Sequence, residues 1–362
     1  MLDLCAFSVI LNGMNKLPLA KRVLILSMLC EGSSMRTISR IADVSINTVT
    51  KLLEDAGETC LALHDELVRD VKSQRIQCDE IWSFCYAKGQ VPRDFIEGSP
   101  VGSNQGLLQI PMVYSVVAPA PLSGRPHVFL VDTGFASGRS MTGRQFTDFE
   151  MPAEILSKVE LEPKDVKTIL LTHLHFDHVG NIGAFKDATI LLQRSEYEGW
   201  KRALKMLPDG PTDKRNWILS SMNLDDIVQF DRAIADGRVK LVEGVHEVCP
   251  GIRLHLAADT HTFGSQWVEI LTPEGPYVVA GDVIASFANV ERMWPPGYHQ
   301  GNCWNLLAAY RDIQSVVGQS QWRRIVPGHD MELFRRMPSW NTGCNPVAEV
   351  HLAAGQRSYV ER

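Results

Sequence analysis

The sequence predicts an α/β protein in which two packed sheets are flanked by helices and preceded by a small helical segment. From about residue 93 onward, apolar β-branched runs that end in polar residues alternate with amphipathic stretches. A cluster of three histidines and an aspartate, in THLHFDHVG at 172–180, follows one of those runs. Residues 19–57 instead show short helical periods separated by turn residues. We therefore expect an N-terminal part over 1–90 and a main domain over 93–362.

The bulk composition is that of an ordinary globular protein. Of the 362 residues, 45% are hydrophobic and 22% are charged, and the net charge of −6 argues against a surface that attracts nucleic acid everywhere. The eight cysteines form no C-x-x-C pair, which favours reduced thiols over disulfides or a thiolate metal site. The first residues are apolar only briefly and include Asp3, so they resemble neither an export signal nor a membrane anchor. We expect a cytoplasmic protein without membrane association, and the composition sets no expectation for the oligomeric state.

The N-terminal part is predicted to contain three short helices. They cover LAKRVLILSMLCEG, MRTISRIA and INTVTKLLEDAG, with Ser34 and Ser45 as caps of the second and third and a glycine as the end of the first and the third. Between positions 16 and 51 there are six basic residues and two acidic ones. This pattern fits a helix-turn-helix that contacts DNA through 19–57, and it fits a plain helical bundle equally well.

The main domain is predicted to be rich in strands. A helix is expected at 151–163, between the first two strands, and another at 303–317, and the polar span 199–226 reads as a partly helical cap. The expected strands are 127–134, 166–172, 188–193, 238–242, 252–257, 266–272 and 277–282.

The histidine cluster has the composition of a metal site. It follows a buried strand, where open α/β folds place their functional loops. In a tight loop the side chains of His173, His175, Asp177 and His178 can converge, and imidazole and carboxylate are ligands that zinc accepts. One loop cannot complete two coordination spheres. The further candidates, each at the carboxyl end of an apolar run, are His261, Asp282 and His329.

This set of residues resembles the metallo-β-lactamase superfamily, whose pattern is H-x-H-x-D-H, then His, then Asp, then His. The resemblance covers about 95–340 and includes VDTG at Asp132. It implies an αββα sandwich with two Zn²⁺ ions per chain between the sheets, and hydrolysis by a hydroxide that bridges them. Carried over, one ion takes His173, His175 and His261, and the other takes Asp177, His178 and His329. Asp282 bridges both ions, and Asp177 acts as a ligand, as a proton carrier or as both.

Within that superfamily the details are most similar to the N-acyl homoserine lactonases. The shared stretches are VDTGF, THLHFDHVGN, HTFGSQ, PPG at 295–297 and PGHD. The resemblance implies ring opening of a lactone, whereas a glyoxalase II-like thioester hydrolase, with the same ligands, is the alternative. Two departures concern the substrate: Ala285 replaces the family tyrosine, for which Tyr298 is a candidate substitute, and Asp259-Thr260 replaces the usual P-G. Trp294, Trp304 and Phe287 are candidates for lining an acyl pocket or for core packing.

A second resemblance covers about 15–88. RIADVSINTVTKLLEDAGETCLALHDE and QRIQCDEIWSFCYAK are similar to the N-terminal part of the insertion-sequence-one transposases, which implies DNA binding by the first segment. Asp79 matches one acid of the nuclease core of that family, and the other acids have no counterpart here. We therefore hypothesise a gene fusion that removed the first strand of the hydrolase, with SFCYAK at 83–88 pairing in its place. A DNA-binding protein with an inert hydrolase part is the remaining alternative.

The other histidines are expected to be unrelated to the metal site. His255 falls within a predicted strand and is expected to be structural. His246, His299 and His351 fall in predicted loops or tails and are expected to be solvated.

Overall fold

The computed structural model describes residues 17–67, 78–98, 106–119, 127–135, 146–207, 219–352 and 358. It divides the chain into two compact units, Met1–Lys72 and Ser73–Arg362. Within the described ranges, no helix is both long enough and apolar enough to cross a bilayer.

The N-terminal unit contains three helices in the predicted order: α1 (Leu19–Cys30), α2 (Met35–Ile41) and α3 (Ile46–Leu67). Gly32 follows the first helix with a φ of 75°, a conformation that favours glycine. Both predicted caps are confirmed, because Ser34 Oγ accepts a hydrogen bond from the amide of Thr37 and Ser45 Oγ from that of Thr48. A small core holds the helices together through Ile25, Ile38, Ala42, Val49 and Leu52.

The predicted end of the third helix is wrong. α3 continues through Gly57 to Leu67, and Gly57 does not adopt a left-handed conformation. A single glycine costs a helix about 1 kcal/mol relative to alanine. The flanking glutamate, alanine and leucine residues favour the helix enough to offset that cost.

The larger sheet of the second unit mixes parallel and antiparallel pairs. In spatial order its described strands are β13 (Ser339–Thr342), β14 (Asn345–Leu352), β1 (Cys78–Pro92), β2 (Leu107–Pro119), β3 (Val128–Val131), β5 (Val166–Leu170), β6 (Thr189–Gln193) and β7 (Val239–Val242), and the short β4 (Phe146–Thr147) also pairs with β1. From β3 to β7 the strands are parallel, so their carboxyl ends meet at one edge.

The smaller sheet has the described order β12 (Ile325–Pro327), β11 (Gly275–Gly281), β10 (Gly264–Thr272), β9 (Ile252–Ala258) and β8 (His246–Cys249). A shared apolar core joins its inner face to that of the larger sheet. Alternation along the strands builds this core: Ile81 and Cys85 of β1 point into it, while Trp82 and Phe84 point to the opposite face.

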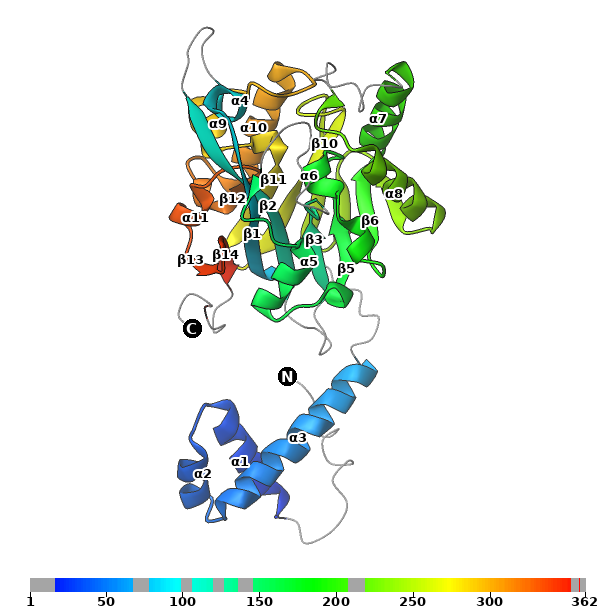
Figure 1. The fold of residues 1–362 in the computed structure, drawn as a ribbon. Coiled ribbons are helices and arrows are strands. Elements are labelled where there is room, and N and C mark those ends of the chain that lie inside the picture. The colour runs from blue at the N-terminus through cyan, green and yellow to red at the C-terminus, as the bar shows by residue number, and fades with distance from the viewer. Residues whose placement is uncertain are drawn as a thin grey trace. The chain divides into compact units, whose positions relative to one another are not determined.

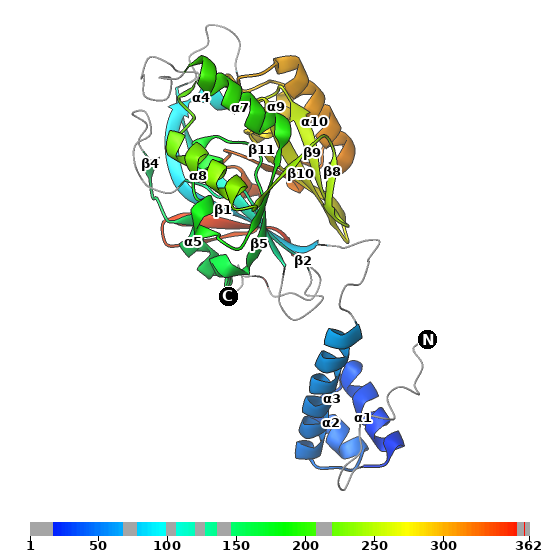
Figure 2. The same ribbon diagram turned by 90° about the vertical axis from the view of Figure 1, so that its right-hand side faces the viewer.

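Helices cover the outer faces of both sheets (Figures 1 and 2). The larger sheet packs on α5 (Pro152–Ile155) with the 3₁₀ turn that follows it, α7 (Arg194–Met206) and α8 (Leu224–Ala235). The smaller sheet packs on α10 (Cys303–Val317). The remaining short helices are α4 (Arg93–Glu97), α6 (Phe176–Val179), α9 (Phe287–Arg292) and α11 (Leu333–Arg336). The predicted αββα arrangement is confirmed, as are the strands expected between 127 and 282 and the helix at 303–317.

Strand β1 lies in the interior of the larger sheet. It pairs antiparallel with β2, with Phe84 opposite Tyr114, and antiparallel with β14 on its other side. The expectation that 83–88 pairs with the hydrolase sheet is therefore confirmed. The boundary between the two units lies at Lys72 and Ser73, before β1. From the sequence it is expected at 90–93, after this strand. The backbone of Asp79 belongs to β1, and its side chain lies outside the described part of the structure.

Candidate metal centre

Four of the predicted ligands lie in the segment that follows β5, which is a loop and then a short helix. His173 and His175 lie in the loop itself, and Asp177 and His178 lie on the short helix α6 that follows. All four are buried. The amide of Phe176 donates to the carbonyl of Ser221 at 2.9 Å, which fixes the turn between the two pairs.

The other three predicted ligands come from neighbouring loops. His261 lies between β9 and β10, Asp282 follows β11, and His329 follows β12. Two glycines allow the approach: a Cβ on Gly281 would lie 2.7 Å from Thr172, and a Cβ on Gly328 would lie 2.2 Å from the carboxylate of Asp282.

The seven side chains form two groups. The first contains His173, His175, His261 and Asp282, and the second contains Asp177, His178 and His329. Within each group the candidate ligand atoms all lie within 4.8 Å of one another. In the first group, Nε2 of His261 lies 3.1 Å from Nδ1 of His175 and 3.2 Å from Oδ2 of Asp282.

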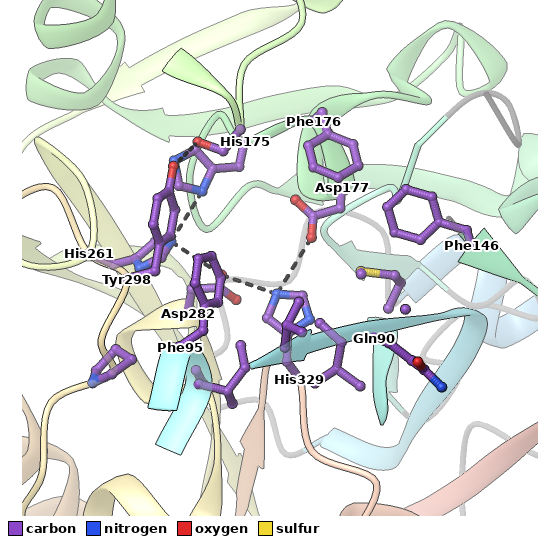
Figure 3. Close-up of a pocket in the computed structure, with 18 residues that line it drawn as sticks. Gln90, Phe95, Phe146, His175, Phe176, Asp177, His261, Asp282, Tyr298 and His329 are labelled. Atoms are coloured by element: carbon purple, nitrogen blue, oxygen red, sulfur yellow. Dashed lines mark hydrogen bonds and ion pairs between the residues drawn. The ribbon is translucent and has the colours of Figure 1, made fainter. Parts of the chain in front are cut away.

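The carboxylate of Asp282 lies between the two groups (Figure 3). Its Oδ2 is 3.1 Å from Nε2 of His329, and its Oδ1 is 3.3 Å from Nε2 of His178, both members of the second group. Nε2 of His329 is also 3.5 Å from Oδ2 of Asp177. Asp282 is therefore placed to serve both groups at once.

Hydrogen bonds on the far side of the rings fix several imidazoles. Nδ1 of His178 lies 2.7 Å from Oδ2 of Asp132, Nδ1 of His329 lies 3.0 Å from the carbonyl oxygen of Pro111, and Nε2 of His175 lies 3.1 Å from Oε1 of Gln300. Metal-binding histidines usually carry such outer partners, because the partner fixes both the tautomer and the ring orientation.

The donor set fits metal ions. Within the described ranges, Nε2 of His173, Nε2 of His178 and Oδ1 of Asp282 are buried and make no hydrogen bond of regular geometry, although the last two atoms lie 3.3 Å apart. Leaving such an atom unsatisfied costs about 1–3 kcal/mol, and a cation bound between these atoms would remove that cost. Five histidines and two carboxylates, with no thiolate, suit zinc better than calcium or magnesium.

Burial and neighbouring charges shift the pKa values of the side chains in the cluster. Burial, followed by the neighbouring His178, holds the pKa of His173 well below its ordinary value, so its imidazole is neutral. Burial opposes ionisation of Asp282, but His329 and His178 outweigh it and hold the pKa of the carboxyl well below its ordinary value. Burial likewise opposes protonation of His178, but the carboxylates of Asp282 and Asp132 raise its pKa well above the ordinary value. A metal at His178 would have to displace that proton.

A pocket opens beside the two groups and is lined mainly by apolar side chains (Figure 3). Phe146 and Phe176 lie on the side of Asp177, and Phe95 and Tyr298 lie on the side of His261. Other lining residues are Gly89, Gln90 and Val91 of β1, Ile110 and Met112 of β2, and Ala285. Strand β1 therefore forms one wall of the pocket.

The sequence profile described as the metallo-beta-lactamase superfamily matches residues 124–317. The chain belongs to that superfamily. An N-acyl homoserine lactonase from a Bacillus species is 30% identical over 217 residues, which is 59% of this chain and 76% of the relative. The chain spans about half the length of a similar lactonase from Bacillus thuringiensis, with 29% identity over 43% of this chain and 55% of that protein.

Solved structures show the same fold. An N-acyl homoserine lactone hydrolase with the product N-hexanoyl-L-homoserine bound at its catalytic metal centre aligns with a TM-score of 0.56 and 22% identity, over 72% of this chain and 97% of the other. AidC, a dizinc quorum-quenching lactonase, aligns with a TM-score of 0.52 and 14% identity, over 79% and 100%. This metallo-β-lactamase-fold chain is thus a lactonase-like, metal-dependent hydrolase.

For this superfamily member, the structure brings all seven predicted ligands together. The candidate acyl-pocket aromatics Trp294, Trp304 and Phe287 are not among the residues that line the pocket, and Trp304 is 72% exposed. His255 is structural as expected, because it stacks on Trp267 and bonds to Glu269. The expectation that His351 is solvated is wrong, because it lies buried in β14, a strand that was read as a tail.

Sequence reasoning missed two kinds of site residue. The β1 residues of the pocket gave no signal, because nothing in Gly89–Val91 indicates which cavity the strand will border. Glu196 did give a signal. Its spacing from Gly199 and Trp200 puts all three on the same buried face of α7, where an acidic residue is unexpected.

Proposed function

We propose that the chain is a dinuclear zinc hydrolase that opens the ring of an N-acyl homoserine lactone or a similar ester. The observation that carries the proposal is the geometry of Asp282. Its carboxylate lies within 3.3 Å of histidines from both ligand groups, in a buried cluster that borders an apolar pocket.

The residues divide naturally between two ions. One ion would be held by His173, His175 and His261, the other by Asp177, His178 and His329, and Asp282 would be shared. Two zinc ions so placed would lower the pKa of a water between them and polarise the carbonyl oxygen of an ester.

We infer that two side chains act on the substrate. Asp177 lines the pocket and is 7% exposed, so its carboxylate can carry a proton to the departing ring oxygen. The hydroxyl of Tyr298 lies 2.8 Å from Ser221 Oγ and 3.3 Å from the amide nitrogen of Gln300, beside His175 and His261. It is placed to donate to the substrate carbonyl, a role that Ala285 cannot perform.

The pocket favours a substrate with an apolar arm. Val91, Ile110, Met112 and Phe146 line the same pocket as Asp177 and His329, and an acyl chain bound against them would be removed from water. The name of the lactonase relative also indicates a substrate that carries an acyl group.

The test is zinc content together with a substrate comparison. We expect about two zinc ions per purified chain, rapid opening of N-acyl homoserine lactones, and slow hydrolysis of acyl thioesters. Faster turnover of thioesters than of lactones would favour the glyoxalase II-like alternative. Two bound zinc ions without turnover of either class would contradict the hydrolase proposal, and D282N, which removes the shared ligand charge, is the inactive control.

We also propose that residues 15–88 derive from an insertion-sequence-one transposase and that 19–57 contacts DNA. The supporting observation is the short turn between α2 and α3, flanked by the exposed cations Arg36, Arg40 and Lys51. In a salt-dependent binding assay with duplex DNA, the double variant R36A/R40A should bind more weakly and with a shallower salt dependence than the wild type. R311A/R323A, which removes two exposed charges from the second unit, is the matched control. Equal binding by all three proteins would contradict DNA contact through this segment.

A further inference from the structure

Glu196 is a fully buried carboxylate outside the seven-residue cluster. It lies in the first turn of α7, directly after β6, and none of its side chain is exposed. Burying a charge is costly unless hydrogen bonds compensate it. Burial raises the pKa of Glu196, and four donors oppose that rise.

Three of the four donors come from the two loops that supply histidines to the first ligand group, and the fourth comes from Trp200 on α7 itself. Oε1 accepts from the amide of Leu174 at 3.0 Å and from the indole of Trp200 at 2.7 Å. Oε2 accepts from the hydroxyl of Thr262 at 2.7 Å and from the amide of Gly264 at 2.8 Å.

These contacts sit one residue away from three ligands. Leu174 lies between His173 and His175, and Thr262 follows His261. Trp200 also contacts the ring of His175 edge-on, with the ring centroids 5.6 Å apart. The Glu196 carboxylate thus links, through hydrogen bonds, the two backbone segments that carry all three histidines of the first group.

Close packing holds the helix against the second of these loops. A Cβ on Gly264 would lie 2.4 Å from the amide nitrogen of Glu196, and a Cβ on Gly199 would lie 2.3 Å from the ring of Phe263. Thr262 is further fixed by Ser265, whose Oγ accepts from the Thr262 amide at 3.1 Å. The loop around His261 therefore has little freedom to move away from α7.

We propose that Glu196 is a positioning residue for the first metal group: it sets the spacing between the His173–His175 loop and His261 without touching the metal. This inference rests on the proposed zinc site. The carboxylate is specifically required, because four donors need four acceptor positions. A glutamine would present an amide NH₂ to two of those donors.

The test is a zinc titration of the metal-free full chain against a competing chelator. The wild type should bind two ions, and E196Q should bind one ion normally and the other about 10- to 100-fold more weakly, as expected for loss of an outer partner. E198Q, an exposed position on the same helix, should behave as the wild type. If the role of Glu196 were purely structural, E196Q would have a lower thermal stability than the wild type, but its affinities for both zinc ions would equal those of the wild type.

A second variant covers the case in which E196Q does not fold. T262V removes one of the four donors and leaves three in place, so it should weaken the same ion in the same direction but less. Unchanged affinities in both variants, or an equal loss at both sites, would overturn the inference while the zinc site stands. A wild-type chain that binds no zinc would instead overturn the proposed function.

Discussion

The carboxylate of Asp132 lies 2.7 Å from Nδ1 of His178, on the side of the ring opposite to Asp282. The same carboxylate accepts from the amide of Thr172 at 2.7 Å and from its hydroxyl at 2.8 Å. Asp132 adopts a left-handed conformation at the end of β3, with a φ of 63°. The carboxylate is thereby held between the strand end and the ligand loop.

Replacing Asp132 by asparagine should weaken the second metal group. Asparagine tolerates the left-handed backbone, so the fold should persist, but the charge that holds His178 is lost. We expect about a 10- to 100-fold fall in affinity for one zinc ion, measured by chelator competition. D148N is the control, because Asp148 has a similar φ of 55° and its carboxylate pairs with Lys88 at the surface. Equal zinc affinity in D132N and D148N would contradict the role of Asp132.

Removal of the Tyr298 hydroxyl should slow turnover without removing metal. Y298F keeps the stacking on Phe95 but loses the group beside the two histidines, so kcat should fall roughly 100-fold while zinc content stays constant. Y310F is the control: its hydroxyl is buried in the core around α10, without a hydrogen-bond partner among the described residues. A kcat of Y298F equal to that of Y310F would exclude Tyr298 from the reaction.

Truncation should show that the second unit folds and functions without the first, provided that β1 is retained. A chain beginning at Ser73 should keep its zinc content and lactone turnover, because it retains β1 and the whole larger sheet. A chain beginning at Arg93 loses an interior strand and its buried Ile81, Trp82 and Phe84, and leaves β2 and β14 with unpaired edges. We expect it to be insoluble or to lack a cooperative thermal transition. A stable, active chain from Arg93 would show that β1 is dispensable.

The stability of the metal-free chain should depend on pH through Asp226. This carboxyl is 4% exposed, and burial, with the charges of Asp225 and Asp177, raises its pKa to about 7. The folded state therefore holds a proton that the unfolded state releases at lower pH. Stability from this group is complete below about pH 4 and is lost as pH rises towards 7, by about 4 kcal/mol at most.

The D226N variant should lose less stability than the wild type between pH 5 and pH 8, measured by urea unfolding of the zinc-free protein. D225N changes the exposed neighbour and should keep most of the wild-type slope. Parallel pH profiles for wild type and D226N would contradict this assignment.

The sequence was sufficient to predict the parts of the fold in which local pattern and burial agree. β3, β5 and β6 are short apolar runs that end in polar residues, and the seven candidate ligands follow such strand ends. Only the stretch 83–88 of β1 is expected from the sequence to pair with this sheet, and β14 is not expected at all. The pairing of these two strands joins segments that are far apart in the chain, and Gly89 and Gln90 do not resemble a buried strand. The place of Glu196 on the buried face of α7 is a local signal, but its role is not, because its partners come from two loops whose meeting no local pattern shows.

The pairing of Glu80 with Leu352 has a consequence for how the chain is made. The three N-terminal helices are built from contacts near in sequence and can form while synthesis continues. Strand β1 emerges soon after them, yet one of its neighbours is β14, among the last described elements. Until β14 leaves the ribosome, one edge of β1 has no strand to pair with. The time during which the chain can aggregate is therefore set by the time needed to translate from β1 to β14. Slower synthesis should lower the yield of soluble protein.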